Sequence, residues 1–446
     1  MFNRNKIREI LDALIIVFYV IKNKINLAII KIIGIDNWHL LALRKLSKNI
    51  LVKSKLYKNK NFSDIPIINK AIHMENFDLI NTVGINKNRA FEVAKQAEVT
   101  RNFTPMLNNI TIGLSSGTSG NRGIFLVSNK ERLRWAGIIL SKILFQSFFD
   151  VFKSNKIAFF LRANSNLYTS LGKSKKIQFR FYDLFQEFSE HIKNLNIYKP
   201  DIIVAPPNVL LLLAQAKLDN LLNINPKKII SVADVLDPKD SLHLQQVFGQ
   251  IIHQIYQCTE GFLATTCKNG TLHLNEDLIF FEKDWLDQEK TKFSPIITDL
   301  TRTSQPIIRY KLDDILTLNL DGCDCGNPCT VIRSIDGRCD DMLYFKHKDD
   351  TNKLVKIFPD FIRNIIIQAS EQITEYQVTQ KALDKIEIQI KSKIDNNREF
   401  DNLKLLLNQF LEKQGCLLPN SNLIEFQEKN ISDKLRRIRR DFVVTS

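Results

Sequence analysis

The sequence lacks the patterns of a secreted or disulfide-stabilised protein. Its seven cysteines are odd in number, and the apolar run at residues 14–21 ends in Lys22-Asn23-Lys24, which offers no small-residue cleavage site. We therefore expect a reducing, cytoplasmic location and no disulfide framework. The same run is shorter than the roughly 20 apolar residues that span a bilayer. It predicts a packed helix, with contact to a membrane surface through residues 1–21 as the alternative.

Two common nucleotide-binding motifs are also missing. The glycine-rich stretch of the chain does not end in Gly-Lys-Ser/Thr, as a Walker loop does, and it does not open directly into a helix, as a dinucleotide fingerprint does. It lies instead between two strand-like runs, residues 110–114 and 124–128, and a helical pattern begins at Asn129. The stretch reads Ser115-Ser116-Gly117-Thr118-Ser119-Gly120-Asn121-Arg122-Gly123. Its small residues, hydroxyls and arginine suit an anion. An exposed hairpin loop is the alternative.

The overall composition is that of an ordinary globular protein. The chain has 446 residues, of which 44% are hydrophobic and 25% charged, enough for two or more domains. The net charge of +15 suits an anionic partner, such as a nucleotide or coenzyme A. The basic residues are scattered through a chain rich in Lys, Asn and Ile, so no nucleic-acid partner is expected.

Strand and helix patterns alternate between residues 150 and 300. Apolar runs at residues 156–161, 201–205 and 228–233 predict buried strands, with a helix over 210–222. This alternation predicts an α/β fold around a largely parallel sheet. Ligands of such sheets bind at the carboxyl ends of strands, where Ala233 and Asp234 lie.

The character of the sequence changes near residue 337. A polar stretch at residues 347–353 precedes a shorter alternation of helix (358–371) and strand (385–390). We therefore expect a large domain over residues 1–336, with a helical N-terminal segment at 1–60, and a small domain over 337–446.

Further motifs follow the glycine-rich loop in a fixed order. They are Tyr256-Gln257-Cys258-Thr259-Glu260-Gly261, Pro306-Ile307-Ile308-Arg309-Tyr310-Lys311-Leu312-Asp313-Asp314, Cys323-Asp324-Cys325-Gly326, Gly337-Arg338-Cys339-Asp340, Ile357-Phe358-Pro359 and Ser432-Asp433-Lys434-Leu435-Arg436-Arg437. From about Ile110 to Arg437 the set resembles the adenylate-forming enzymes, most closely the phenylacetate–coenzyme A ligase-like branch. The resemblance implies a large α/β adenylate-forming domain with layered sheets and helices, and a small, mobile α+β C-terminal domain.

The resemblance also implies an activity. Such an enzyme uses ATP to activate a small carboxylic acid as its acyl adenylate, releases pyrophosphate, and then transfers the acyl group to a thiol such as coenzyme A. An amine, a hydroxyl or an acyl carrier protein is the alternative acceptor, and a non-catalytic nucleotide-binding protein is a further alternative. The phosphoryl chemistry depends mainly on positioning and on neutralisation of charge.

Roles for individual residues follow from the same resemblance. The β- and γ-phosphates are expected to be bound by Ser115, Ser116, Gly117, Thr118, Ser119 and Gly120. Thr259 is expected to contact the α-phosphate. Glu260 is expected to bind Mg²⁺, which favours carboxylate oxygens. The adenine is expected against Tyr256, Ala233 and Asp234, and the ribose on Asp314 beside Arg338. Lys434 is expected to bridge the substrate carboxylate and the α-phosphate, and Asp340 to be the hinge of the small domain.

Four positions depart from the family pattern. Asp313 stands where glycine usually precedes the ribose-binding aspartate, and Asp433 replaces the glycine before the lysine. Val355 and Lys356 occupy the usual glycine and asparagine positions of the loop that shapes the thiol tunnel. Adenylation is expected to be intact, while coenzyme A as acceptor stays open.

A cysteine–histidine pattern predicts either a structural zinc site or buried reduced thiols. Cys267-x5-His273 and Cys323-x-Cys325 supply three thiolates and an imidazole, with Cys329 in reserve. A three-residue loop at 269–271 would place Cys267 and His273 opposite each other on one hairpin face. A two-residue turn would place them on opposite faces and exclude the site.

Overall fold

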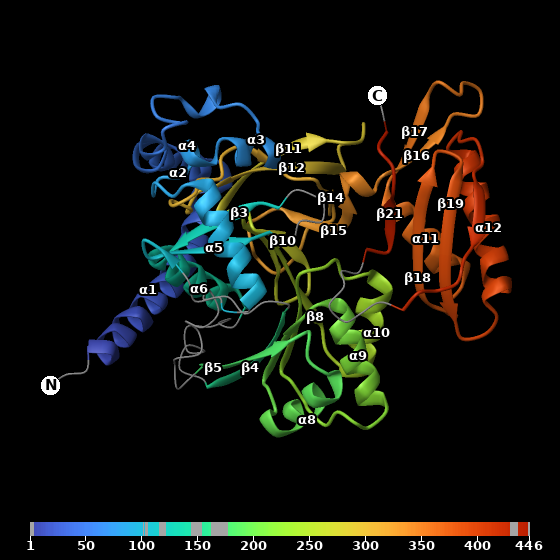
Figure 1. The fold of residues 1–446 in the computed structure, drawn as a ribbon, viewed down its shortest axis with the longest axis horizontal. Helices are drawn as coiled ribbons and strands as arrows, with labels where there is room; N and C mark the ends of the chain where they lie inside the picture. The colour runs from blue at the N-terminus through green and yellow to red at the C-terminus, as the bar shows by residue number, and fades with distance from the viewer. Residues whose placement is uncertain are drawn as a thin grey trace. The chain divides into compact units, whose positions relative to one another are not determined.

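The computed structural model describes residues 4–100, 102, 106–115, 122–143, 154–161, 177–428 and 436–444 (Figure 1). The chain divides into two compact units. Unit 1 comprises Met1–Trp285, Pro295–Leu312 and Leu318–Arg333, and unit 2 comprises Leu286–Ser294, Asp313–Thr317 and Ser334–Ser446. The expected boundary after residue 336 and the hinge at Asp340 stay predictions.

Unit 1 begins with helices. They are α1 (Arg4–Ile33), α2 (Ile35–Asn49), η1 (Leu51–Lys53), η2 (Phe62–Asp64), α3 (Lys70–Glu75), α4 (Phe77–Ile80) and α5 (Lys87–Thr100). Gly34 separates α1 from α2 with a φ of 82°, a conformation that glycine adopts without strain. The short apolar run is part of a longer stretch, Ile7–Ile33, which is long and apolar enough by length and composition to cross a membrane. The expectation that this segment is too short to do so is therefore wrong.

A three-stranded antiparallel sheet carries the glycine-rich loop. Its strands are β1 (Met106–Leu107), β2 (Ile110–Leu114) and β3 (Ile124–Ser128), and α6 (Asn129–Ile143) follows. The two strands and the helix expected on either side of the loop are thus confirmed. In β2 and β3, Ile110, Ile112, Ile124 and Leu126 are buried because they alternate toward a core formed with α4 and α5.

The expected parallel strands are confirmed. The order β5-β4-β6-β7-β8 is parallel at every step, and helices connect most of these strands. The elements are β4 (Asn155–Leu161), β5 (Ile177–Asp183), α8 (Phe188–Tyr198), β6 (Ile202–Ala205), α9 (Pro207–Leu218), β7 (Lys228–Ser231), α10 (Pro238–Phe248) and β8 (Ile252–Gln257). Apolar residues continue through β6 and β7 because both faces are covered.

Beyond β8 the expectation of a largely parallel sheet is wrong. The next strands are β9 (Phe262–Thr266), β10 (Leu272–Leu274), β11 (Ile279–Trp285), β12 (Lys292–Asp299), β13 (Tyr310–Lys311), β14 (Asp314–Leu318) and β15 (Val331–Arg338). Here β8, β9, β10 and β15 pair antiparallel in that order. The short links between β8, β9 and β10 can join only antiparallel neighbours, because a parallel pair needs a long crossover.

Unit 2 contains the expected α+β arrangement. A four-stranded sheet, ordered β20-β19-β18-β21, packs with α11 and α12 around a core that includes Ile366, Ile388 and Leu407. Its elements are η4 (Cys339–Asp341), β16 (Leu343–Lys346), β17 (Leu354–Ile357), α11 (Pro359–Ala369), β18 (Ile373–Ala382), β19 (Lys385–Ser392), α12 (Asn396–Lys413), β20 (Asn420–Leu423) and β21 (Ile438–Arg440). That this part of the chain moves stays a prediction.

Candidate nucleotide site

The glycine-rich loop is described only at its two ends. Ser116, Gly117, Thr118, Ser119 and Gly120 lie outside the described residues. At the near end, the Ser115 N–H donates to the Gly123 carbonyl at 2.8 Å. The Ser115 hydroxyl accepts hydrogen bonds from the Gly123 N–H at 2.7 Å and from Lys70 Nζ at 3.1 Å. The β2–β3 hairpin therefore closes beside a lysine from α3.

Arg122 does not supply the free positive charge that its place in the loop suggested. Its guanidinium forms a two-pronged ion pair with Glu98, at 2.5 Å and 2.7 Å. Its Nε donates to the Ser115 carbonyl at 3.1 Å. Because the charge is paired with a carboxylate, Arg122 braces the base of the hairpin.

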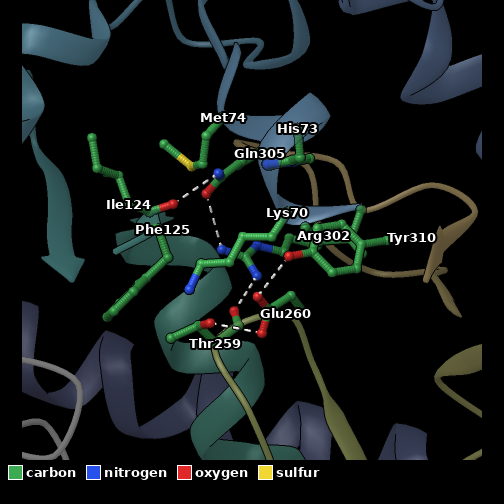
Figure 2. A pocket seen from close by; sticks show the side chains of 12 residues that line it. Lys70, His73, Met74, Ile124, Phe125, Thr259, Glu260, Arg302, Gln305 and Tyr310 are labelled. Carbon is green, nitrogen blue, oxygen red and sulfur yellow. Dashed lines mark hydrogen bonds between the residues drawn. The ribbon is translucent and has the colours of Figure 1, made fainter. Parts of the chain in front are cut away.

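A pocket opens next to this hairpin, within unit 1 (Figure 2). Its walls come from α3, β3, the turn after β8, and the segment that follows β12. The lining residues are Lys70, His73, Met74, Gly123, Ile124, Phe125, Thr259, Glu260, Arg302, Gln305, Ile307 and Tyr310. Gly123 allows the close approach of α3, since a Cβ there would lie 3.1 Å from Lys70 Cε. The pocket thus brings two cations, one carboxylate and two hydroxyls together.

Glu260 is held in its ionised form at the pocket wall. Figure 2 shows its carboxylate accepting hydrogen bonds from the Thr259 hydroxyl at 2.7 Å and the Tyr310 hydroxyl at 3.0 Å. Burial raises the pKa of Glu260, but these hydrogen bonds and one from Cys258 outweigh it, so the pKa is lowered. An ionised carboxylate fits the expected Mg²⁺ ligand, because Mg²⁺ favours hard oxygen donors.

Arg302 connects the pocket's two sides. Its Nη1 donates to the Thr259 carbonyl at 2.6 Å, and its Nη2 donates to Gln305 Oε1 at 3.1 Å. The Gln305 side chain also bonds to β3, accepting from the Leu126 N–H at 2.9 Å and donating to the Ile124 carbonyl at 3.0 Å. The turn that carries Thr259 is thereby tied to the strand that ends the glycine-rich loop.

A buried carboxylate at the start of α6 positions the segment that carries Arg302. Glu131 accepts from the Thr303 and Ser304 N–H groups, at 2.5 Å and 2.8 Å, and from the Ser304 hydroxyl. It also accepts from the Ser128 N–H at 2.9 Å. Burial raises the pKa of Glu131, but the hydrogen bonds from Ser128 and Ser304 dominate and lower it to about 2. The carboxylate is therefore ionised at neutral pH.

His73 presents a polar edge to the pocket. It is 3% exposed, and its Nε2 has no hydrogen-bond partner among the described residues. Burial, together with the nearby Arg302, lowers the pKa of His73 to about 4, so the ring is neutral at pH 7. Its ring packs edge-on against Tyr310, with centroids 5.5 Å apart. A neutral imidazole here can hydrogen-bond to a bound molecule.

The residues expected around the adenine lie at the carboxyl ends of the parallel strands in unit 1. Tyr256 is buried near the end of β8. Ala233 follows β7 with a φ of 72°, which a non-glycine residue seldom adopts. The Asp234 N–H donates to the Val232 carbonyl at 2.9 Å, closing a tight turn there. These positions agree with the location expected for a ligand of a parallel sheet, while the individual roles stay predictions.

Other expected residues belong to unit 2. Asp314 begins β14, and its Oδ1 lies 3.8 Å from Arg338 Nε, so these two are brought together. Asp340 lies in η4. Lys434 lies outside the described residues. Its described neighbour Arg436 pairs with Asp341.

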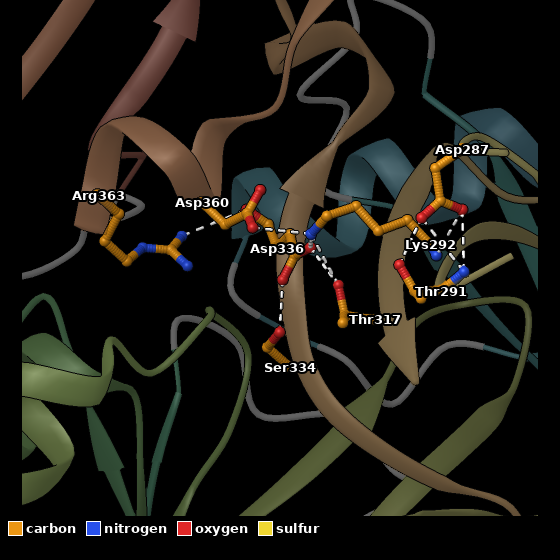
Figure 3. A network of polar contacts seen from close by, with 8 residues as sticks. All are labelled: Asp287, Thr291, Lys292, Thr317, Ser334, Asp336, Asp360 and Arg363. Atoms are coloured by element: carbon orange, nitrogen blue, oxygen red, sulfur yellow. Dashed lines mark hydrogen bonds and ion pairs between the residues drawn. The ribbon is translucent and has the colours of Figure 1, made fainter. Parts of the chain in front are cut away.

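A buried lysine organises the polar interior of unit 2 (Figure 3). Lys292 Nζ donates to Asp336 Oδ2 at 2.5 Å, to Asp360 Oδ2 at 2.7 Å and to Thr317 Oγ1 at 2.9 Å. Asp360 stands in the first turn of α11, so the lysine links that helix to β12, β14 and β15. Burial lowers the pKa of Lys292, but the two aspartates outweigh burial and raise it, so the lysine is charged.

The expected cysteine–histidine cluster forms within unit 1. One ligand atom from each of Cys267, His273, Cys323 and Cys325 lies within 4.8 Å of the others. The Cys267 and Cys323 sulfurs are 3.7 Å apart, and Cys325 Sγ is 3.3 Å from His273 Nε2. A tetrahedral zinc with Zn–S bonds of about 2.3 Å places its sulfurs about 3.8 Å apart. The donor set therefore fits a tetrahedral metal.

The hairpin register differs from the expected one. His273 pairs with Thr265, and the Cys267 N–H donates to the Thr271 carbonyl at 2.8 Å, so the loop is 268–270 and not 269–271. Cys267 and His273 are therefore diagonal neighbours on adjacent strands and do not lie directly opposite each other. The strand pairing is shifted by two residues from the expected one. Because side chains alternate between faces with a period of two, the two residues still lie on the same face of the hairpin. His273 Nδ1 lies 3.1 Å from the Cys329 carbonyl, which directs Nε2 toward the cluster. Cys329, the reserve ligand, thus contributes its carbonyl and not its thiol.

Sequence reasoning missed Lys70, His73, Arg302 and Gln305. In a chain with 63 lysines and arginines, a single lysine carries no signal of its own. Lys70 and His73 are three residues apart, which places them on one side of a helix, and this spacing is the only hint the sequence offers. Their place in the pocket depends on contacts with segments 45 or more residues away.

The fold of the chain is similar to that of solved proteins. No protein-family model matches the sequence. A solved 2-hydroxyisobutyryl-CoA ligase, in the postadenylation state with 2-HIB-AMP, is similar in fold, with a TM-score of 0.64 and 14% identity over 90% of this chain and 88% of that one. The chain therefore has the mixed α/β fold of adenylate-forming ligases.

Two curated proteins are similar in sequence. Indoleacetate–lysine synthetase of Pseudomonas savastanoi is 27% identical over 228 residues, which are 48% of this chain and 55% of that protein. Phenylacetate-coenzyme A ligase of Thermus thermophilus is 26% identical over 98 residues, which are 21% of this chain and 20% of that protein. The chain thus spans about half of the first relative and a fifth of the second.

Proposed function

We propose that this protein is an ATP-dependent ligase that activates a carboxylic acid as its acyl adenylate, releases pyrophosphate, and transfers the acyl group to a thiol such as coenzyme A. The pocket in which Lys70, Arg302, Glu260 and Thr259 meet at the β2–β3 hairpin carries the proposal. Cations and hydroxyl donors beside an ionised carboxylate suit a polyphosphate with its divalent cation. The relative solved with an acyl adenylate supports the same chemistry.

In this reaction a carboxylate oxygen of the acid attacks the α-phosphorus of ATP, and the bond from that phosphorus to the bridging oxygen of pyrophosphate breaks. Thr259, whose hydroxyl donates to Glu260 in this structure, would turn that hydrogen to the α-phosphate. Glu260 would hold Mg²⁺, which neutralises phosphate charge. Lys70 and the loop at residues 115–120 would bind the leaving pyrophosphate. Lys434 neutralises the charge that develops between the carboxylate and the α-phosphate.

The nucleoside has its own binding residues in this proposal. The ribose hydroxyls donate to Asp314, and Arg338 holds that carboxylate in place. Tyr256 packs on the adenine, with Ala233 and Asp234 at its edge. The carboxyl ends of β7 and β8 are the physical reason for this assignment, because ligands of parallel sheets bind there.

An amine is the second candidate acceptor. The similarity to indoleacetate–lysine synthetase, which extends over 48% of this chain, favours it. The replacement of the usual glycine and asparagine by Val355 and Lys356 in the expected thiol tunnel favours it as well. A hydroxyl or an acyl carrier protein would use the same adenylate.

Formation of AMP tests the activity. The full chain is incubated with ATP, Mg²⁺ and a library of carboxylic acids, with coenzyme A or free lysine as acceptor, and nucleotides and products are identified by mass spectrometry. We expect AMP, not ADP, in the presence of at least one acid, together with a thioester or an amide that identifies the acceptor. Formation of ADP, or AMP that does not depend on an acid, would contradict the proposal.

We propose further that Cys267, His273, Cys323 and Cys325 hold a structural zinc ion. Three thiolates and one imidazole are a usual zinc donor set, and zinc would fasten the β9–β10 hairpin to the segment before β15. Metal analysis of the purified protein should give close to one zinc per chain, and the double substitution Cys323→Ser/Cys325→Ser should abolish it. Cys339→Ser, elsewhere in the chain, is the control. An unmodified protein without metal would refute the site.

A further inference from the structure

Helix α1 presents a long apolar stripe to solvent. Nine large apolar side chains on it are at least 38% exposed, and they include Leu14 at 61% and Ile32 at 84%. The nine are Ile7, Ile10, Leu11, Leu14, Ile15, Phe18, Ile25, Ile29 and Ile32. At 3.6 residues per turn they fall on one side of the helix. An exposed apolar surface of this length on a folded unit marks a contact surface.

The opposite side of α1 packs against the rest of unit 1. Tyr19, Val20 and Ile30 are buried, and Asn23 donates to the buried Asp277 carboxylate at 2.6 Å. Helix α6 approaches so closely that a Cβ at Gly137 would lie 2.6 Å from a carbonyl oxygen of α1. In Figure 1 the N-terminal turns of α1 project beyond α6. While this packing persists, α1 cannot cross a bilayer, although its length would allow it.

Basic residues border the apolar stripe. At 3.6 residues per turn, Arg8 and Lys22 lie along one margin, and Lys24 lies along the other. Both acidic residues of α1 lie on the opposite side, with the packed residues. Lys22 Nζ is 5.7 Å from the centroid of the Phe18 ring, so its stem runs along the stripe. Helices α1 and α2 together carry nine basic and three acidic residues.

An apolar stripe between two basic margins matches the boundary between lipid chains and anionic headgroups. The apolar side chains gain free energy by leaving water, and the basic groups meet the phosphates just above them. We propose that α1 docks unit 1 on an anionic membrane surface, with its axis in the membrane plane. A protein partner would not require basic groups on both margins of the stripe.

Vesicle flotation with the full chain tests this docking. We expect the protein to float with vesicles of phosphatidylcholine and phosphatidylglycerol, and to float less with phosphatidylcholine alone or at high salt, because salt screens the headgroups. The stripe variant Leu11→Glu/Leu14→Glu/Phe18→Glu should bind at least about tenfold more weakly. The margin variant Arg8→Gln/Lys22→Gln/Lys24→Gln should lose a similar amount for the anionic vesicles only.

A matched control variant tests whether vesicle binding depends on α1 in particular. Ile197→Glu/Leu221→Glu/Leu242→Glu alters three apolar side chains of unit 1 that are at least 58% exposed and lie outside α1. This variant should bind vesicles as the unmodified chain does, and circular dichroism should show that all variants are folded. Failure of the unmodified chain to float, or equal binding by the stripe variant, would overturn the proposal. A dimer that the stripe variant dissociates, without any vesicle binding, would overturn it in favour of a second copy of the chain.

Discussion

Replacing Glu131 by glutamine tests how the pocket is held together. The side chain is 8% exposed, and its two carboxylate oxygens accept hydrogen bonds from Ser128, Thr303 and Ser304. A glutamine of the same size can accept at only one oxygen, and its amide NH₂ then faces backbone N–H donors. Buried donors without an acceptor are costly. The segment that carries Arg302 should therefore loosen.

The pKa of Glu131 sets the size of the effect. Its pKa is lowered from 4.5 to about 2 in the folded protein. Each unit corresponds to about 1.4 kcal/mol, so ionisation of this group contributes about 3 kcal/mol to the free energy of unfolding. Because the folded pKa is the lower one, this contribution is present in full above pH 4.5 and is lost as the pH falls toward 2. Glutamine resembles the protonated acid and should remove it at neutral pH.

Urea unfolding followed by tryptophan fluorescence measures this loss. All three tryptophans lie in Met1–Trp285, so the signal reports on unit 1, and Trp135 is on the same helix as Glu131. We expect the variant to be less stable than the unmodified protein by about 3 kcal/mol at pH 7, with the difference shrinking below pH 4.5. Glu190→Gln, at a side chain that is 56% exposed, should change little. A difference that does not depend on pH would refute the reasoning.

Three further predictions concern lysines. Lys70→Met should raise the KM for ATP about tenfold or more in steady-state assays, because it removes a charge-assisted contact to phosphate. Lys95→Met, at an exposed position, is the control. Equal KM values for Lys70→Met and the unmodified protein would remove Lys70 from the site. Lys292→Met leaves the buried Asp336 carboxylate without its ion-pair partner and should destabilise unit 2 by about 3–5 kcal/mol. The loss should appear as faster amide exchange in α11, and adding Asp336→Asn and Asp360→Asn should restore protection. Unchanged exchange in the single variant would refute this. Lys434→Ala should slow adenylation by at least about 10²-fold, and an unchanged rate would remove it from the mechanism.

Local patterns predicted much of the fold. Apolar runs bounded by turn residues predicted β4, β6 and β7, and two strand-like runs predicted the β2–β3 hairpin, because strand burial follows from residue spacing alone. The antiparallel half of the sheet was missed because polar and charged residues interrupt the apolar pattern of strands such as β11, β12 and β15. The apolar run in α1 was judged too short because the lysines at positions 22 and 24 interrupt the pattern within a continuous helix.

Site residues that belong to a sequence motif could be predicted. Thr259 and Glu260 could be predicted because their order in the chain follows a family pattern, and the cysteine cluster because its spacing suits a metal. The residues that hold Thr259 and Glu260 in position could not be predicted from the sequence. Glu131 and Ser304 are separated by 173 residues, and no local feature of the sequence pairs them. Arg122 was expected to meet phosphate, and its pairing with Glu98 depends on the packing of α5 beside the hairpin.

Exchange of labelled pyrophosphate into ATP tests the central claim most directly, because it requires only that an acyl adenylate forms reversibly. In the presence of Mg²⁺ and a suitable carboxylic acid, we predict exchange that depends on the acid, needs no acceptor, and is lost in Glu260→Gln. Measurable ATP binding without exchange for any acid in a broad library would contradict the account, and would make the protein a nucleotide-binding protein without ligase activity.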